Sequence, residues 1–250
     1  MASADPPLNH FPTTDRTWLM TQIDKGIDAE SAGDSTSHKA AIRAIGGRVM
    51  ESYRAPLIAF VQRSRWRTLG DAADLVATFF SRRLESLEYL KRWRSESVPL
   101  RKWLMNGMIL ELRLIARDAR RQSARDSGSS SFKGGASESN ESADKSAERA
   151  FDRVWARGLI QIAAQRASEE LSAEGKEKSW QLFERHILDG VEYAKVAAEL
   201  CVPLADARAM SRMAAYRLNR ALRALLAQEG TPEAELDRAV EDVNDAAQGD

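Results

Sequence analysis

Apolar residues recur three and four positions apart along most of the chain, which predicts amphipathic helices and an all-α fold. Stripes of this period predict helices over residues 42–65 and 71–90, and Pro56 is expected to bend or break the first of them. The clearest stripe predicts a helix over residues 100–121. Its inward face is expected to comprise Leu104, Met108, Leu112, Ile115 and Ala119.

Residues 193–212 carry the residue types that a helix-turn-helix needs. Contacts between its two short helices are expected from Val196, Leu200, Val202, Ala207 and Met210. Ala197 is the small residue at the helix crossing, and Cys201 occupies the turn. The outer face of the second helix would present Asp206, Arg208, Ala209 and Arg212. Such a helix fits the DNA major groove, where arginine reaches guanine through two hydrogen bonds; the alternative is an ordinary helical hairpin in a bundle core.

A segment of different composition separates these patterns. Residues 122–147 hold nine serines and three glycines with almost no apolar side chains, so they cannot offset their own ordering entropy. They predict a flexible Ser/Gly-rich linker between two helical lobes, residues 40–121 and 148–228. Residues 1–39 are expected to form an N-terminal arm, and residues 229–250 an acidic tail.

Charge is segregated along the chain, although Lys+Arg and Asp+Glu both number 37. Residues 53–121 contain fifteen basic and seven acidic side chains, and residues 203–223 contain five arginines and one aspartate. The tail holds eight acids and one arginine. Two basic segments with an acidic tail are typical of nucleic-acid binders, and we hypothesise that the tail lies over a basic lobe and masks it.

Composition argues against several other classes of protein. The one cysteine, Cys201, excludes a disulfide framework and indicates a cytoplasmic location. No apolar run approaches the roughly 20 residues of a membrane span, and no signal-peptide core is present. Phosphate-cradling glycine loops, metal-ligand spacings and nucleophile–base groupings are also missing from the sequence. We therefore expect no enzyme activity, cofactor or metal.

Cations and tryptophans alternate around residue 100, which is the chemistry that binds single-stranded nucleic acid. Cations hold phosphates there, and aromatic rings stack on unpaired bases. The candidates are Arg92, Trp93, Arg101, Lys102, Trp103 and Asn106. Further along the predicted helix, the polar side carries Arg113, Arg117, Arg120 and Arg121. The alternatives are that both tryptophans are core residues and that the arginines form a solvated surface.

Six segments also carry family-like motifs: residues 11–18, 53–61, 71–80, 100–104, 151–156 and 193–212. The first reads Phe-Pro-Thr-Thr-Asp-Arg-Thr-Trp, and the third reads Asp-Ala-Ala-Asp-Leu-Val-Ala-Thr-Phe-Phe. In this order the motifs resemble those of bacterial extracytoplasmic-function sigma factors, which are promoter-recognition subunits of RNA polymerase. The resemblance is to the variety with an N-terminal Phe-Pro-Thr-Thr-Arg-Trp motif and an extended helix-turn-helix domain.

The resemblance implies a non-catalytic factor that binds core RNA polymerase and promoter DNA and directs transcription initiation. It leaves room for an anti-sigma or other regulatory protein as a partner. Docking on polymerase would involve Asp71, Asp74, Leu75, Phe79 and Phe80. The opened minus-ten element would contact Arg92, Trp93, Arg101, Lys102, Trp103, Asn106, Arg113, Arg117 and Arg120. The minus-thirty-five duplex would contact Asp206, Arg208, Ala209, Arg212, Arg217 and Arg220.

Several residues depart from the family pattern. Ala73, Ala77 and Thr78 replace polar or acidic residues of the docking helix, which weakens the case for polymerase binding. Cys201 stands where glycine is common, and it is strained if that position needs a positive φ. A DNA-binding regulator that no longer engages polymerase, or a protein-interaction module, therefore remains an alternative.

Overall fold

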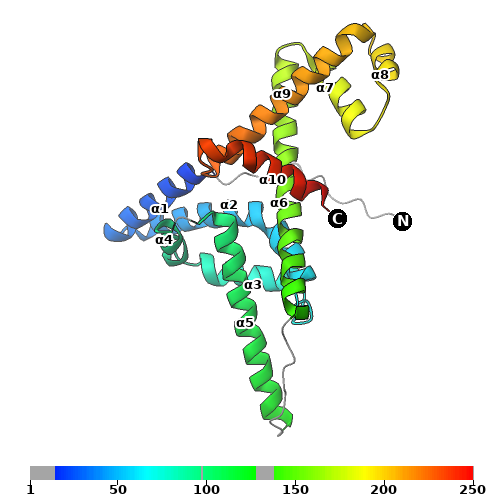
Figure 1. Cartoon of the computed structure of the whole chain (residues 1–250). Coiled ribbons are helices and arrows are strands. Elements are labelled where there is room, and N and C mark those ends of the chain that lie inside the picture. Colours follow the sequence, from blue (N-terminus) through cyan, green and yellow to red (C-terminus); the bar gives the residue numbers. More distant parts are fainter. Residues whose placement is uncertain (1–14, 97, 128–137, 250) are drawn as a thin grey trace, which may run out of the picture. The chain divides into compact units, whose positions relative to one another are not determined.

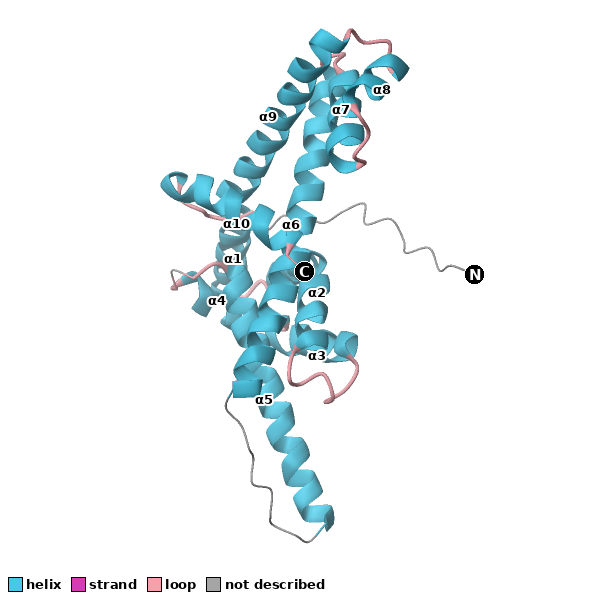
Figure 2. Ribbon diagram, turned by 45° about the vertical axis from the view of Figure 1, so that its right-hand side comes forward, coloured by secondary structure: helices cyan, strands magenta, loops and turns pink. Residues whose placement is uncertain are grey.

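The computed structural model describes residues 15–96, 98–127 and 138–249. Within these ranges the chain forms helices joined by turns and contains no strand (Figures 1 and 2). The predicted all-α fold is confirmed. Backbone contacts divide the chain into two units. The described part of the first unit covers residues 15–156 and 243–249, and the second unit covers residues 157–242.

The first unit is built from five helices and the beginning of a sixth. They are α1 (Arg16–Ser31), α2 (Ser35–Arg63), α3 (Ala72–Leu84), α4 (Glu88–Arg94), α5 (Leu100–Ser127) and α6 (Glu138–Ala173). The second unit takes the remainder of α6 and adds shorter elements. These are α7 (Glu177–Phe183), the π-helix η1 (Glu184–Leu188), α8 (Tyr193–Glu199), α9 (Leu204–Gln228) and the 3-10 helix η2 (Glu233–Glu235). Residues of α10 (Leu236–Gln248) belong partly to each unit.

Aspartates start the first three helices. The side chains of Asp15, Asp34 and Asp71 accept hydrogen bonds from backbone N–H groups in the first turns of α1, α2 and α3. These N–H groups have no partner within the helix, so each cap stabilises its helix by about 1 kcal/mol. The aspartate at position 71 therefore has a structural role.

Helices α1 and α2 pack together, α2 and α3 pack together, and α5 contacts both α2 and α3. Of the predicted bend or break at the buried Pro56, the break does not occur, because α2 continues through this residue. Glu111 of α5 is 2% exposed, and its carboxylate accepts hydrogen bonds from Arg82 at 2.6 Å and from Arg83 at 3.2 Å. The buried Glu111 carboxylate and these two more exposed arginines join α5 to α3.

Gly107 allows α5 to approach the residues that precede it. A Cβ added at this position would lie 2.1 Å from the hydroxyl oxygen of Tyr89. That hydroxyl donates a 3.0 Å hydrogen bond to the carbonyl of Trp103, and burial raises the pKa of Tyr89. Only a residue without a side chain leaves the Tyr89 ring in this position.

Two predicted segment boundaries need correction. Residues 16–31 are helix α1, which packs on α2, so the part of the N-terminal arm that the structure describes is folded into the first unit. Residues 122–127 end α5 and residues 138–147 begin α6, so both ends of the predicted linker are helical. Residues 128–137 and residues 11–14 of the N-terminal motif lie outside the described part of the chain.

Apolar clusters among the described residues hold the helices of the second unit together. One joins Ala167 and Leu171 of α6 to Trp180 and Phe183 of α7 and to Ala214 of α9. The other has Leu182, Val196, Ala197 and Ala207 at its centre, and Leu200, Val202 and Met210 pack around them. The predicted contacts of the helix-turn-helix are confirmed.

Candidate nucleic-acid interface

The turn between α8 and α9 is sharp and has one strained residue. Cys201 has φ +52°, which is the left-handed region that favours glycine, and its side chain is exposed. The next residue, Val202, donates its N–H to the carbonyl of Ala197 at 2.9 Å. Helix α9 then begins after Pro203 without a side-chain cap. The predicted strain at Cys201 is thus present.

The turn leaves one side of α9 open to solvent near its beginning. The predicted residues Asp206, Arg208, Ala209 and Arg212 are all exposed. Neither arginine is paired with a carboxylate among the residues that the structure describes. Asp206 lies in the first turn, where the positive end of the helix dipole favours a carboxylate.

Two further residues extend this side of α9. Leu204 is 54% exposed and Tyr216 is 65% exposed. Leu204, Arg208, Arg212 and Tyr216 follow one another at intervals of four residues, so they lie along one side of the helix. We call these four residues the α9 outer face. Leu204 and Tyr216 were not among the predicted site residues, although their four-residue spacing from the two arginines is visible in the sequence.

The remaining arginines of α9 are engaged within the protein. Arg217 donates to Glu174 at 2.6 Å and lies 3.5 Å from Glu170. Arg220 donates to Glu170 as well. Hydrogen bonds from Lys176 and the charge of Arg217 lower the pKa of Glu174. Arg217 and Arg220 were expected on DNA phosphates, but in the structure they pair with carboxylates of α6 and of the turn after it.

The next arginine along α9 pairs with the acidic tail. Arg223 donates to Glu233 at 3.2 Å and to Asp237. These contacts join α9 to η2 and to the first turn of α10. They neutralise one basic side chain of the second unit, Arg223, and involve neither Arg208 nor Arg212 of the α9 outer face.

Of the two tryptophans expected to stack on bases, Trp93 is buried and Trp103 is half-buried. Trp93 is 1% exposed, its ring nitrogen donates to the carbonyl of Val98 at 2.9 Å, and the Arg16 guanidinium lies over its ring. Trp103 is half-buried, and its ring is tilted against Tyr89 at 5.5 Å between centroids. Trp93 is therefore a core residue, because the ring cannot be buried in the unit and stacked on a base at the same time.

The cations beside these rings are divided between internal contacts and the surface. The Arg101 guanidinium lies 4.0 Å from the centre of the Trp155 ring. Burial raises the pKa of the neighbouring Asp152, and the charges of Arg101 and Lys102 oppose this shift. By contrast, Arg92, Lys102 and Asn106 are exposed.

Helix α5 carries a group of exposed cations in the part of the helix that follows the buried Leu112. Arg113, Arg117, Arg120 and Arg121 are all exposed, and Asp118 lies 3.7 Å from Arg117 and 4.0 Å from Arg121. Such exposed pairs stabilise little, so they leave the arginines available. Of the predicted apolar stripe, Leu104, Met108 and Leu112 are buried but Ala119 is exposed. Leu110, which is 55% exposed on the same helix, was not among the predicted site residues.

The residues expected to dock on polymerase include two exposed aspartates and three buried apolar residues. Asp74 is exposed, whereas the exposed carboxylate of Asp71 caps α3 through 2.8 and 3.1 Å hydrogen bonds. Leu75, Phe79 and Phe80 are 8%, 0% and 1% exposed. Their burial makes them core residues that present no surface to a partner.

Two cations that precede α5 attach the first helix to α4. Lys91 donates to Glu30 at 2.8 Å and to Glu88 at 3.0 Å, and these hydrogen bonds raise the pKa of Lys91. Arg94 donates to Asp24 of α1. Both cations therefore hold α1 in place.

Comparison of the chain with models of protein families, with curated proteins and with solved structures gave no match. Within the described ranges, no helix combines the length and apolar content that crossing a membrane requires. Among the same residues, no three His, Cys, Asp or Glu side chains are grouped as a metal site would need.

Proposed function

We propose that the protein is a sigma-like transcription-initiation factor, which binds core RNA polymerase and directs it to promoters. The observation that carries the proposal is the α9 outer face, where Arg208 and Arg212 lie on the second helix of the helix-turn-helix, exposed and without a carboxylate partner among the described residues. A helix presented in this way can place guanidinium groups on guanine edges in the major groove.

A second basic surface on a separate unit supports the proposal. Arg113, Arg117 and Arg120 extend along one exposed helix in the first unit. Because the aromatic rings beside them are largely buried, we propose that this surface holds the phosphates of the opened minus-ten strand. Arg92, Lys102 and Asn106 are the exposed residues near the start of α5 that would contribute to the same interaction.

A stand-alone DNA-binding regulator is the second candidate. Helix α3 offers one carboxylate that is exposed and free of a capping role, Asp74, and it presents Ala73 and Ala77 where polar or acidic residues are usual. A surface with so little charge gives weak electrostatic complementarity to a basic site on polymerase. The two candidates make the same prediction for duplex DNA and opposite predictions for polymerase.

The deciding experiment is capture of bacterial core RNA polymerase by the full chain. Asp74→Lys should weaken capture by about tenfold or more if α3 docks through this carboxylate. Asp71 is left unchanged, because replacing it removes the cap of α3 as well as a charge. Glu51→Lys is the matched control, since Glu51 is an exposed carboxylate on α2.

Each outcome separates the candidates. Capture by the intact chain and by the Glu51 variant, with loss in the Asp74 variant, supports polymerase docking through α3. Equal capture of all three proteins keeps the sigma-like function and rejects the docking site. If no polymerase is captured while duplex DNA is bound, the stand-alone regulator is the better description.

A further inference from the structure

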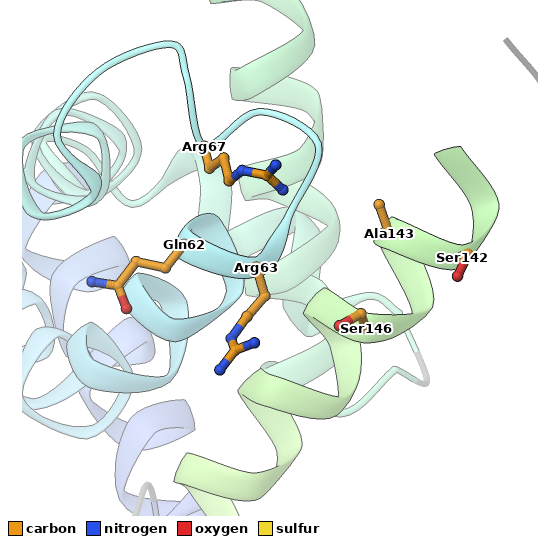
Figure 3. Close-up of a pocket in the computed structure, with 6 residues that line it drawn as sticks. All are labelled: Gln62, Arg63, Arg67, Ser142, Ala143 and Ser146. Carbon is orange, nitrogen blue, oxygen red and sulfur yellow. The ribbon is translucent and has the colours of Figure 1, made fainter. Parts of the chain in front are cut away.

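A hollow in the first unit lies where the end of α2 faces the beginning of α6 (Figure 3). Its volume is about 520 Å³. The residues that line it are Gln62, Arg63, Arg67, Ser142, Ala143 and Ser146. Except for Ala143, these side chains all carry hydrogen-bond donors, and two of them are permanently positive.

The turn after α2 explains why the arginines face outward. Ser64 is fully buried, donates its hydroxyl to the Val61 carbonyl at 2.9 Å and accepts the Trp66 N–H at 3.1 Å. Trp66 is also buried, at 7% exposure. Because residues 64 and 66 point into the core, the arginines that alternate with them are left at the surface.

The charge of these arginines is only partly neutralised. Arg65 lies 3.6 Å from Asp144 of α6, and its guanidinium also covers the Trp66 ring at 4.3 Å. Arg63 and Arg67 are exposed and pair with no carboxylate among the described residues. Of these three arginines, only Arg65 pairs with a carboxylate among the described residues, and Arg63 and Arg67 border the hollow.

We propose that this hollow binds a phosphate group. Guanidinium forks from one side and serine hydroxyls from the other match the several acceptor oxygens of a tetrahedral anion. The hollow is larger than one phosphate, so it accommodates either free phosphate or one phosphate within a nucleic-acid backbone. The proposal is independent of polymerase binding, because it uses residues to which no role has been assigned above.

The test is a titration of the full chain with inorganic phosphate. Arg63→Gln with Arg67→Gln should weaken binding by about tenfold or more, since two charge-assisted contacts are lost. Arg54→Gln is the control, because Arg54 is an exposed arginine on the same helix away from the hollow. Ser146→Ala should weaken binding by about threefold without any change of charge, which tests the site even if the double variant folds poorly.

A second titration, with a single-stranded oligonucleotide, identifies the source of the phosphate. If the double variant also loses affinity for the oligonucleotide and shows a weaker salt dependence, the hollow holds a nucleic-acid backbone. If only phosphate binding is lost, the ligand is free phosphate. The proposal is overturned if the intact protein does not bind phosphate, or if the hollow variants and the control bind it equally.

Discussion

The five arginines of α9 fall into two groups that differ in their partners. Arg208 and Arg212 are exposed and unpaired within the described chain. Arg217, Arg220 and Arg223 pair with carboxylates of α6, the turn after it, η2 and α10. A guanidinium that already has a carboxylate must break that contact before it can hold a phosphate. The comparison shows that the charge of a helix does not by itself locate a DNA-binding surface.

Replacing the two unpaired arginines is the strongest test of the difference between the two groups. Arg208→Ala with Arg212→Ala should weaken duplex binding by about 2–4 kcal/mol, or roughly 30- to 1,000-fold, because the two side chains that we propose to read bases are lost. Fluorescence anisotropy on DNA selected from a random-sequence pool by the intact protein measures the change. Unaltered affinity would show that this side of α9 does not read DNA.

Removing the paired group should act on stability. Arg217→Ala with Arg220→Ala is expected to lower the free energy of unfolding by about 1 kcal/mol, because the contacts that join α9 to α6 are lost. Duplex affinity should change by less than about threefold. Urea unfolding and the same anisotropy assay give both values. A loss of DNA binding as large as that of the unpaired variant would erase the distinction between the groups.

A substitution in the turn before α9 leaves both the unpaired and the paired arginines intact. Cys201→Gly should raise the free energy of unfolding by about 1 kcal/mol, because glycine adopts φ +52° without steric strain. DNA affinity should stay constant, since the α9 outer face is unaltered. A less stable variant in thermal unfolding would contradict the assignment of strain to this residue.

The smallest expected effect comes from the tail. Glu233→Gln with Asp237→Asn should free Arg223 and strengthen duplex binding about two- to threefold at low salt, with the gain fading as salt rises. Point changes are preferable to deletion, because Leu236 and Val240 of α10 are buried. Binding curves at several salt concentrations provide the measurement. A constant affinity would leave the tail without a masking role at α9.

Local patterns predicted the helix-turn-helix well. Val196, Val202 and Ala207 were predicted from the residue types that a helix-turn-helix needs, and they pack in the second apolar cluster. Capping signals could have improved the rest of the prediction. An aspartate at Asp15 followed by Leu19 and Ile23 indicates the start of an amphipathic helix, where an arm was expected.

Composition misjudged the serine-rich segment for a physical reason. Ala147, Phe151 and Trp155 are buried, so the middle of α6 is held by packing. Once a helix is anchored, each added residue needs to fix only its own backbone for one more hydrogen bond. Helix α6 therefore extends back to Glu138 through residues with little apolar content.

The sequence by itself determined the all-α class, the helical periods and the position of the turn at Cys201, because these depend on residues within a few positions of one another. Only the tertiary structure decided that Trp93 faces the core and that Arg217 is paired while Arg212 is not. Glu174, whose carboxylate accepts a hydrogen bond from the Nη2 atom of Arg217, lies 43 residues away in the chain. Contacts over such separations depend on how the helices pack, and side-chain spacing along one helix does not encode them.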